Sequence, residues 1–532
     1  MPRRSPEPRI RAMKTFVTPA KAVTPAKAVT PAKAVTPARA VTPAKAVTPA
    51  KAVTPAKAGA QFLQTFPTPA KAAAPLLLAL IVAGCATPPP IDPASLPVTP
   101  AAFREEGPRF TAVTPQPPQE WWRAFGDAQL DELVARADRS NTTIQVAAAR
   151  LVQARALLRQ SRAQQLPQVG VSAGAQRIDG LGLTNLPAGH PVTIYTAAAN
   201  ASYEADLFGK LALATKASSL DAAASESLLR DAKLVIEADV AQAYLALRAV
   251  DEERNLVRRT VDAYRGTLDL TERRYRAGDV AELDVARARA QVASTQSDAL
   301  ALDRRRSEIE HSIAVLVGEA ASSFSVGERA WDTALPSIPA GVPATVLARR
   351  PDVQAAQASM LAAQSRVGVA KAAWVPDITL TGTGGFASSQ IEDLFRYSAR
   401  AWGIGLLASL PIFDGGRREA GVQFAGGEMD VAVARYREQV LVALRDVEDQ
   451  LAALRLLQEQ AQAQDRAVTA AARATTLSGI RYRDGIVSQL DLLDAQRNEL
   501  LNRRAALEVR SAQYQATVGL VRALGGGWEA QS

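Results

Sequence analysis

The chain of 532 residues is predicted to adopt an α+β fold in which one unit of long helices and short strands occurs twice. A ten-residue pattern recurs 207 residues later, and proline-free stretches far exceed the length of an ordinary helix. Other short segments alternate between apolar and polar residues, as strands with one apolar face do. Only 5% of the residues are aromatic, while Ala and Leu are abundant, which favours long helices over a thick aromatic core.

Residues 1–84 are expected to be a leader that export removes. The hexapeptide VTPAKA runs seven times in tandem over 17–58, with Arg39 as the one variant, and its regular prolines prevent a helix. This cationic repeat could attract anionic lipid or nucleic acid, or it could belong to no mature protein. The net charge of +9 comes from the leader, because residues 75–532 hold 49 basic and 52 acidic side chains. The exported chain gives no reason to expect a nucleic-acid partner.

A lipoprotein signal is predicted at the end of this leader. Lys71 precedes an apolar run that is too short to span a bilayer and that ends in VAGC at Cys85. This ending matches the bacterial lipobox, in which the cysteine receives diacylglycerol and N-acyl chains and becomes the mature N-terminus. The alternative is a buried free thiol in a hydrophobic helix. Ala86 follows the cysteine, as in lipoproteins sent to the outer membrane, and residues 85–120 are expected to form an extended, lipid-anchored tether.

The internal repeat rests on four pairs of matching segments in the same order. The clearest pair is 275–284 (YRAGDVAELD) and 482–491 (YRDGIVSQLD). The other pairs are 166–171 with 375–380, 206–209 with 411–414, and 240–248 with 447–455. Because four landmarks keep one order, the chain is expected to hold two copies of one unit, at 121–335 and 345–526, followed by a tail at 527–532.

Each copy is expected to contain two strands. The even positions of 402–413 are apolar, while the odd positions include Gly and Ser, and segments 195–206 and 378–383 also alternate. A half-buried strand of a soluble sandwich would alternate too, but long strands rimmed by Tyr and Trp in an exported chain favour a membrane barrel. Four strands cannot enclose a useful bore, so one chain should supply about a third of a shared barrel. Loops at 178–191 and 388–400 are expected to join the strands of each pair.

The helices are predicted to be far longer than those of globular proteins. No proline occurs over 210–276, and about 65 residues at about 1.5 Å each give a helix near 100 Å. Apolar residues follow at coiled-coil spacing: Val250, Val257, Val261, Tyr264 and Leu268 in one copy, and Val440, Leu444, Val447, Leu451 and Leu454 in the other. Gly278 and Gly485 are expected to end these helices and to turn the chain into antiparallel partners at 279–316 and 486–524.

The composition argues against an enzyme, a metal site and a cofactor. One cysteine excludes a disulfide framework and a cysteine-ligated zinc site, and His190 and His311 are too far apart in sequence to suggest a metal cluster. The phosphate-binding, zinc-protease and serine-hydrolase motifs do not occur. Asp491 and Asp494 could in principle form an acid–base pair, but they stand on a coiled-coil helix without any signal of a pocket.

These features together resemble the TolC-type outer-membrane factor family of efflux channels, specifically its lipoprotein (NodT-like) branch. The resemblance covers 120–526 and rests on the lipobox, the repeated Tyr-x-x-Gly-x-x-x-x-x-Asp pattern, the Pro-containing strand starts, PIFDGG at 411–416 and RRPD at 349–352. It implies a homotrimer with four transmembrane strands per chain, in which a 12-stranded β-barrel continues into a periplasmic α-barrel of coiled-coil hairpins.

The resemblance also implies partners and a place in the cell. A periplasmic adaptor and an inner-membrane pump of the resistance–nodulation–division (RND) type would deliver drugs or other toxic solutes to a channel in the outer membrane of a Gram-negative bacterium. Outer-membrane lipid would surround the strands and hold the anchor. The sequence does not identify the solute. The alternative function is a lipid-anchored periplasmic coiled-coil scaffold.

Four residues are implied to form the periplasmic gate. Asp491 and Asp494, on one helix face, would form acidic rings that narrow the pore and favour cations. Tyr482 and Asp284 match family positions that hydrogen-bond between neighbouring hairpins and hold the entrance shut. Val487 stands where some members carry an arginine latch, so this chain departs from the family there. The simpler interpretation of the four gate residues is a solvated helix face with one packed tyrosine.

The two hairpin turns are implied to contact the adaptor. The residues concerned are Gly278, Asp279, Gly485 and Ile486. Opening would then be a shift between two packings of the helices that adaptor binding drives, without chemistry in this chain.

Overall fold

The computed structural model describes residues 87–105, 120–178, 191–339, 341 and 343–527. All of them belong to one contact unit, Pro69–Ser532, and the other unit, Met1–Thr68, lies outside the described ranges. The predicted leader, the lipobox and Cys85 therefore lie outside the described residues, as does most of the predicted loop at 178–191.

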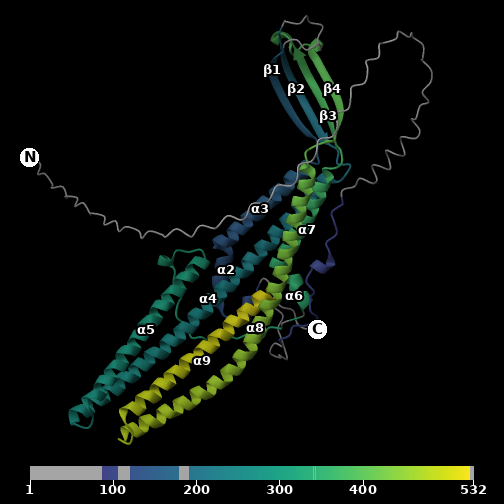
Figure 1. Cartoon of the computed structure of the whole chain (residues 1–532). Coiled ribbons are helices and arrows are strands. Elements are labelled where there is room, and N and C mark those ends of the chain that lie inside the picture. Colours follow the sequence, from purple (N-terminus) through teal and green to yellow (C-terminus); the bar gives the residue numbers. More distant parts are fainter. Residues whose placement is uncertain (1–86, 106–119, 179–190, 340, 342, 528–532) are drawn as a thin grey trace, which may run out of the picture. The chain divides into compact units, whose positions relative to one another are not determined.

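The two sequence repeats form the same series of elements (Figure 1). The first series is α3 (Thr142–Ala163), β1 (Gln168–Ile178), β2 (Val192–Glu204), α4 (Lys210–Ala277) and α5 (Glu282–Leu316). The second is α7 (Pro351–Ala372), β3 (Asp377–Ser388), β4 (Arg400–Ser409), α8 (Arg417–Arg483) and α9 (Gln489–Ala523). The turn η2 (Trp121–Phe125) and α2 (Ala128–Ser140) precede the first series, and α6 (Pro343–Arg349) precedes the second. The predicted α+β fold with an internal repeat is confirmed.

The four strands form one antiparallel sheet in the order β1-β2-β3-β4, and the β2–β3 pair joins the two repeats. Gly385 lies opposite Ala198, where an added Cβ would come within 2.2 Å of the Ala197 carbonyl oxygen, so this close approach requires glycine. β1 and β4 are the edges of this sheet, and an edge strand presents backbone groups that can pair with a further strand.

Apolar side chains stand exposed along β4 in the predicted alternation. Trp402, Ile404 and Leu406 are 80%, 84% and 72% exposed. The predicted strand at 402–413 is too long, because β4 ends at Ser409. Pro411 explains the difference, since proline has no N–H to continue a strand ladder. The predicted strand at 195–206 lies two to three residues too far along the chain at each end, since β2 runs from Val192 to Glu204.

The long helices end close to Gly278 and Gly485, as the sequence analysis predicted. α4 has 68 residues, which at about 1.5 Å each is close to 100 Å, and α8 has 67. The predicted heptad positions form the contact face, since Val250, Val257 and Tyr264 are at most 3% exposed. In the second copy Val447 and Leu451 are buried as well.

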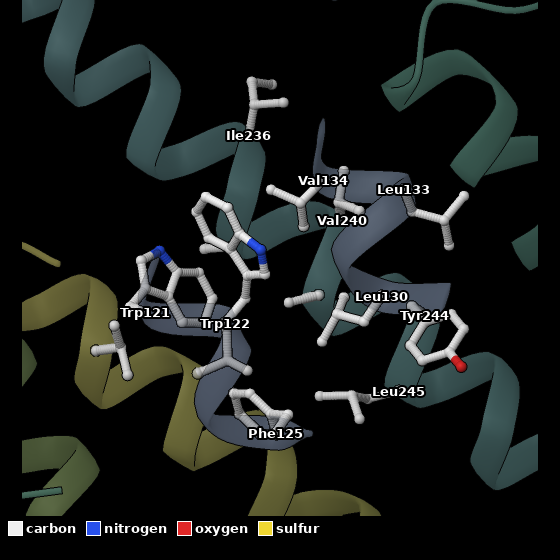
Figure 2. Packing of buried hydrophobic residues seen from close by; sticks show 14 of the residues in the cluster. Trp121, Trp122, Phe125, Leu130, Leu133, Val134, Ile236, Val240, Tyr244 and Leu245 are labelled. Atoms are coloured by element: carbon white, nitrogen blue, oxygen red, sulfur yellow. The ribbon is translucent and has the colours of Figure 1, made fainter. Parts of the chain in front are cut away.

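A hydrophobic core joins η2, α2 and α4 (Figure 2). Trp121 and Phe125 are fully buried, and Trp121 meets Trp122 edge-to-face with ring centroids 5.9 Å apart. Each such side chain contributes about 1.5–3 kcal/mol when it is buried. The indole N–H of Trp121 donates to Glu237 on α4 at 3.0 Å. Burial raises the pKa of Glu237 to about 7, and the charge of Asp138 adds to this shift.

The described part of the tether runs along the helices in an extended conformation. Its one ordered turn is Pro93–Ser95. The Gln364 side chain on α7 donates to the Pro89 carbonyl oxygen at 2.7 Å. Further along, the Glu448 carboxylate on α8 accepts the backbone N–H groups of Arg104 and Glu105 at 2.7 and 2.9 Å. Residues 87–105 are thereby fixed to the second repeat.

Candidate functional site at the hairpin turns

Both hairpin turns close with the same backbone pattern. Gly278 and Gly485 have φ values of +85° and +75°, in the left-handed region that favours glycine. In each turn the glycine N–H bonds the carbonyl three residues back, and the next N–H bonds the carbonyl five residues back, at 2.9 and 2.8 Å. This is the Schellman arrangement, which satisfies the last carbonyls of a helix.

The turn residues are open to solvent. Gly278, Asp279, Gly485 and Ile486 are all exposed, and Ile486 is 63% exposed. An exposed apolar side chain at the tip of a hairpin suits contact with another apolar surface. Val487, which stands where some members of the resembled family carry an arginine, is partly buried.

Asp491 has a local role that the sequence analysis missed. Ser488 and Asp491 form a capping box at the start of α9, in which the carboxylate accepts the Ser488 backbone N–H at 3.0 Å and its hydroxyl at 2.7 Å. The hydroxyl bond, with the backbone bond and the charge of Arg481, holds the pKa of Asp491 below its usual range. The exposed carboxylate is therefore ionised and fixed in direction.

Asp494 lies one turn further along α9. Its side chain is 57% exposed, with the Arg497 guanidinium 3.7 Å away. Leu492 and Leu493, which lie between the two aspartates, are buried. Asp491 and Asp494 thus share the exposed side of α9, which fits both a pore-lining acidic pair and a solvated helix face.

Tyr482 contacts the other hairpin of its own chain. It is 2% exposed, and its hydroxyl is hydrogen-bonded to the Thr271 hydroxyl on α4 at 3.2 Å. Asp284, in the first turn of α5, instead lies 3.7 Å from Arg287 on its own helix. Within the chain Tyr482 is therefore tied to Thr271, and a bond from Asp284 to a neighbouring hairpin stays a prediction.

Arg274 is a further residue at this contact that the sequence analysis did not select. From α4 it donates to the Tyr482 carbonyl oxygen at 3.0 Å and to the Arg483 carbonyl oxygen at 2.8 Å. Its guanidinium carbon also lies 4.7 Å from the centroid of the Tyr482 ring. The signal was present in the sequence, because the Arg-Tyr-Arg triplet at 274–276 recurs at 481–483.

A cavity of about 450 Å³ lies between the two hairpins beside this contact. Its lining from α4 is Ala263, Gly266, Thr267 and Leu270, and its lining from α8 and α9 is Thr475, Thr476, Gly479, Ile480, Tyr482, Arg483, Leu492 and Gln496. This cavity is open to solvent, so the two hairpins leave unfilled space between them at this level.

None of the helices in the described ranges combines the length and the apolar character needed to cross a membrane.

Comparison with known proteins identifies the family. The outer membrane efflux protein family matches residues 133–319 and 342–526, once for each repeat. The chain is 33% identical over 418 residues to the pyoverdine export outer membrane protein OpmQ of Pseudomonas aeruginosa, which covers 77% of this chain and 88% of that protein. It is 31% identical over 465 residues to the toluene efflux pump outer membrane protein TtgC of Pseudomonas putida, covering 85% and 95%.

A solved structure agrees with these relatives. The outer membrane protein VceC of Vibrio cholerae superposes with a TM-score of 0.73 at 29% identity, over 78% of this chain and 100% of that chain. The chain therefore belongs to the outer membrane efflux protein family. It is an outer-membrane channel of an efflux system.

Proposed function

We propose that three copies of the chain form one channel, which receives solutes from a periplasmic adaptor and an inner-membrane RND-type pump. The observation that carries this proposal is the sheet, which has two edges and exposed alternating apolar residues. Strands in lipid must pair all their backbone groups, so the edges β1 and β4 need partners. Three four-stranded sheets joined edge to edge make a 12-stranded barrel, and the paired hairpins continue it as a tunnel.

The cargo is expected to be drugs or other toxic solutes. The names of two relatives mention chemically unlike solutes, pyoverdine and toluene. The outer-membrane component alone therefore does not define the solute, which is consistent with selection by the pump.

The mature chain is proposed to begin at Cys85, after removal of residues 1–84, and to carry a covalent diacylglycerol and an N-acyl chain on that cysteine. The two efflux repeats then follow the tether at 121–335 and 345–526. Support comes from the tether itself, which is fixed to α7 only a few residues after Cys85. Mass spectrometry of the N-terminal peptide tests this proposal, and detection of residues 1–84 in the mature protein would contradict it.

The hairpin turns are proposed to be the gate and the docking end. Asp491 and Asp494 would form acidic rings, Tyr482 and Asp284 would hold the closed packing, and Gly278, Asp279, Gly485 and Ile486 would meet the adaptor. The ionised, exposed state of Asp491 supports an acidic ring. The same lowered pKa argues against Asp491 as a general acid in an acid–base pair with Asp494, because a general acid needs a pKa near the working pH. The chain is proposed to have no catalytic activity and to need no cofactor.

The test of the assembly is its behaviour on a denaturing gel and in a planar bilayer. We expect a species of trimer mass that resists detergent until it is boiled, and that conducts current in a bilayer. The alternative, a lipid-anchored periplasmic scaffold, predicts a monomer that carries no current.

A further inference from the structure

The contact between the two hairpins depends on one arginine and one tyrosine. Arg274 places two N–H groups on two consecutive carbonyls, those of Tyr482 and Arg483, and covers the Tyr482 ring. The Thr271 hydroxyl meets the tyrosine hydroxyl at the opposite end of the ring. Arg274 and Thr271 of α4 thus bind Tyr482 and Arg483 of α8, and Tyr482 is almost completely buried.

The position of the two carbonyls makes this contact stronger than an ordinary surface pair. They belong to the last turn of α8, where the helix carries a partial negative charge. The bonds of the turn itself go to the carbonyls of Ile480, Arg481 and Tyr482. The Arg274 guanidinium therefore supplies the Arg483 carbonyl with a charge-assisted donor from the other hairpin.

The internal repeat places the same groups at the opposite boundary of the chain. At the offset of 207 residues, Arg481 corresponds to Arg274, Tyr275 corresponds to Tyr482, and Ser478 corresponds to Thr271 with its hydroxyl retained. The α4 turn closes with the same Schellman bonds as the α8 turn. Both the donor set and the acceptor set of the contact are therefore present a second time.

The tyrosine of this second set is not covered within the chain, and the charge of Arg481 acts on Asp491 of its own hairpin. Tyr275 is 45% exposed, and Arg481 is exposed as well. In the part of the chain that the structure describes, neither a hydroxyl hydrogen bond nor a ring contact forms on the Tyr275 side chain. Tyr482, the counterpart of Tyr275 in the other repeat, is only 2% exposed. The difference indicates that a group from outside the chain covers Tyr275.

A closed ring of three chains supplies that group. Three copies present six hairpins that alternate between the first and second type, so three of the six boundaries lie within chains and three between them. Within the chain α4 packs against α9, and the equivalent packing across a boundary puts α8 beside α5 of the next copy.

We propose that Arg481 covers Tyr275 of the next copy and donates to the carbonyls of Tyr275 and Arg276 there, while Ser478 bonds the Tyr275 hydroxyl. The inference rests on the proposed trimer. Six arginine–tyrosine locks would then ring the channel one turn above the hairpin tips. This ring does not need the arginine that Val487 replaces.

Cross-linking with a bis-maleimide tests the second set of locks directly. Arg481→Cys with Tyr275→Cys is expected to link different copies, which gives dimers and trimers on a boiled denaturing gel. Arg274→Cys with Tyr482→Cys is the matched pair and is expected to link only within one chain. The parent, whose one cysteine is Cys85, shows the background. Linkage of the Arg481 pair within one chain, or no linkage while the Arg274 pair reacts, would overturn the inference.

A second measurement covers the case in which the cysteine variants do not assemble. Arg481→Met is expected to raise the open-to-closed ratio on the order of tenfold for each copy that loses its charged hydrogen bonds, so the open probability of the channel rises. Arg473→Met, on an exposed part of α8, is the control. An equal open probability of the two variants in single-channel recordings would count against the lock. Both measurements start from the assembled trimer, which is cross-linked before boiling or recorded in a bilayer. Absence of a trimer would overturn the proposed function as well. A trimer without these effects would overturn the lock alone.

Discussion

Loss of the lock within the chain is expected to open the channel. Arg274→Met keeps a straight side chain of similar reach but removes both donors to the Tyr482 and Arg483 carbonyls. A hydrogen bond to a charged group contributes about 1.5–3 kcal/mol. Because Arg274 is only partly buried, we take about 1.5 kcal/mol for the two bonds together, which is about tenfold in the open-to-closed ratio of one copy.

The trimer multiplies this effect. If the three copies open together, the three losses add to about 4–5 kcal/mol, which is roughly a thousandfold shift toward the open state. Arg274→Lys is expected to have an intermediate effect, because an ammonium group cannot place two parallel donors on both carbonyls.

The assay is single-channel recording in planar bilayers. Arg273→Met is the matched control, since Arg273 lies next along the helix and pairs with Asp269 of the same helix, with its side chain 60% exposed. We expect the open probability to rise in the order control, Arg274→Lys, Arg274→Met. An Arg274→Met channel that stays as closed as the control would refute the reasoning.

Three further variants test other parts of the fold. Glu237 has its pKa raised to about 7 from 4.5, so its ionisation destabilises the folded chain increasingly between pH 4.5 and pH 7. Glu237→Gln should remove this pH dependence of the folding free energy, which is on the order of 3 kcal/mol. The trimer dissociation temperature of the variant should then no longer fall from pH 5 to pH 7.5. A dissociation temperature that falls as much as in the parent would contradict the assignment. Gly385→Val should lower the amount of trimer in the outer membrane because its Cβ would meet backbone, whereas Gly384→Val meets open space and should not; equal yields would count against the strand register. Glu448→Ala should free the tether, measured as faster proteolysis at residues 96–105 than in Glu428→Ala; equal rates would show that the carboxylate does not hold it.

Much of the fold could be predicted because it depends on local chemistry. A helix without proline continues until a residue needs a left-handed φ, so Gly278 and Gly485 marked the helix ends within a few residues. The alternation in β4 likewise predicted that Trp402, Ile404 and Leu406 share one face, and all three are exposed. The end of that strand was missed because the apolar pattern continues past Ser409, while Pro411 removes the backbone donor.

The contacts of the candidate site could be predicted only in part. Tyr482 was selected from its motif, but its partner Thr271 lies 211 residues away, and no spacing rule connects the two. Arg274 was missed because an arginine in the last turn of a helix ordinarily serves its own helix. Here the Arg274 guanidinium reaches the end of α8. This contact depends on the packing of α4 beside the second hairpin, which the sequence does not reveal.

The central claim, that the chain is a channel with an acidic gate at its hairpin tips, is tested most directly by one recording. The unboiled, lipidated protein is placed in a planar bilayer under a KCl gradient, and the single-channel current and its reversal potential are measured. We expect discrete current steps whose reversal potential lies on the cation-selective side, as rings of Asp491 and Asp494 would impose. Protein of trimer mass that gives no steps above the lipid background would contradict the account.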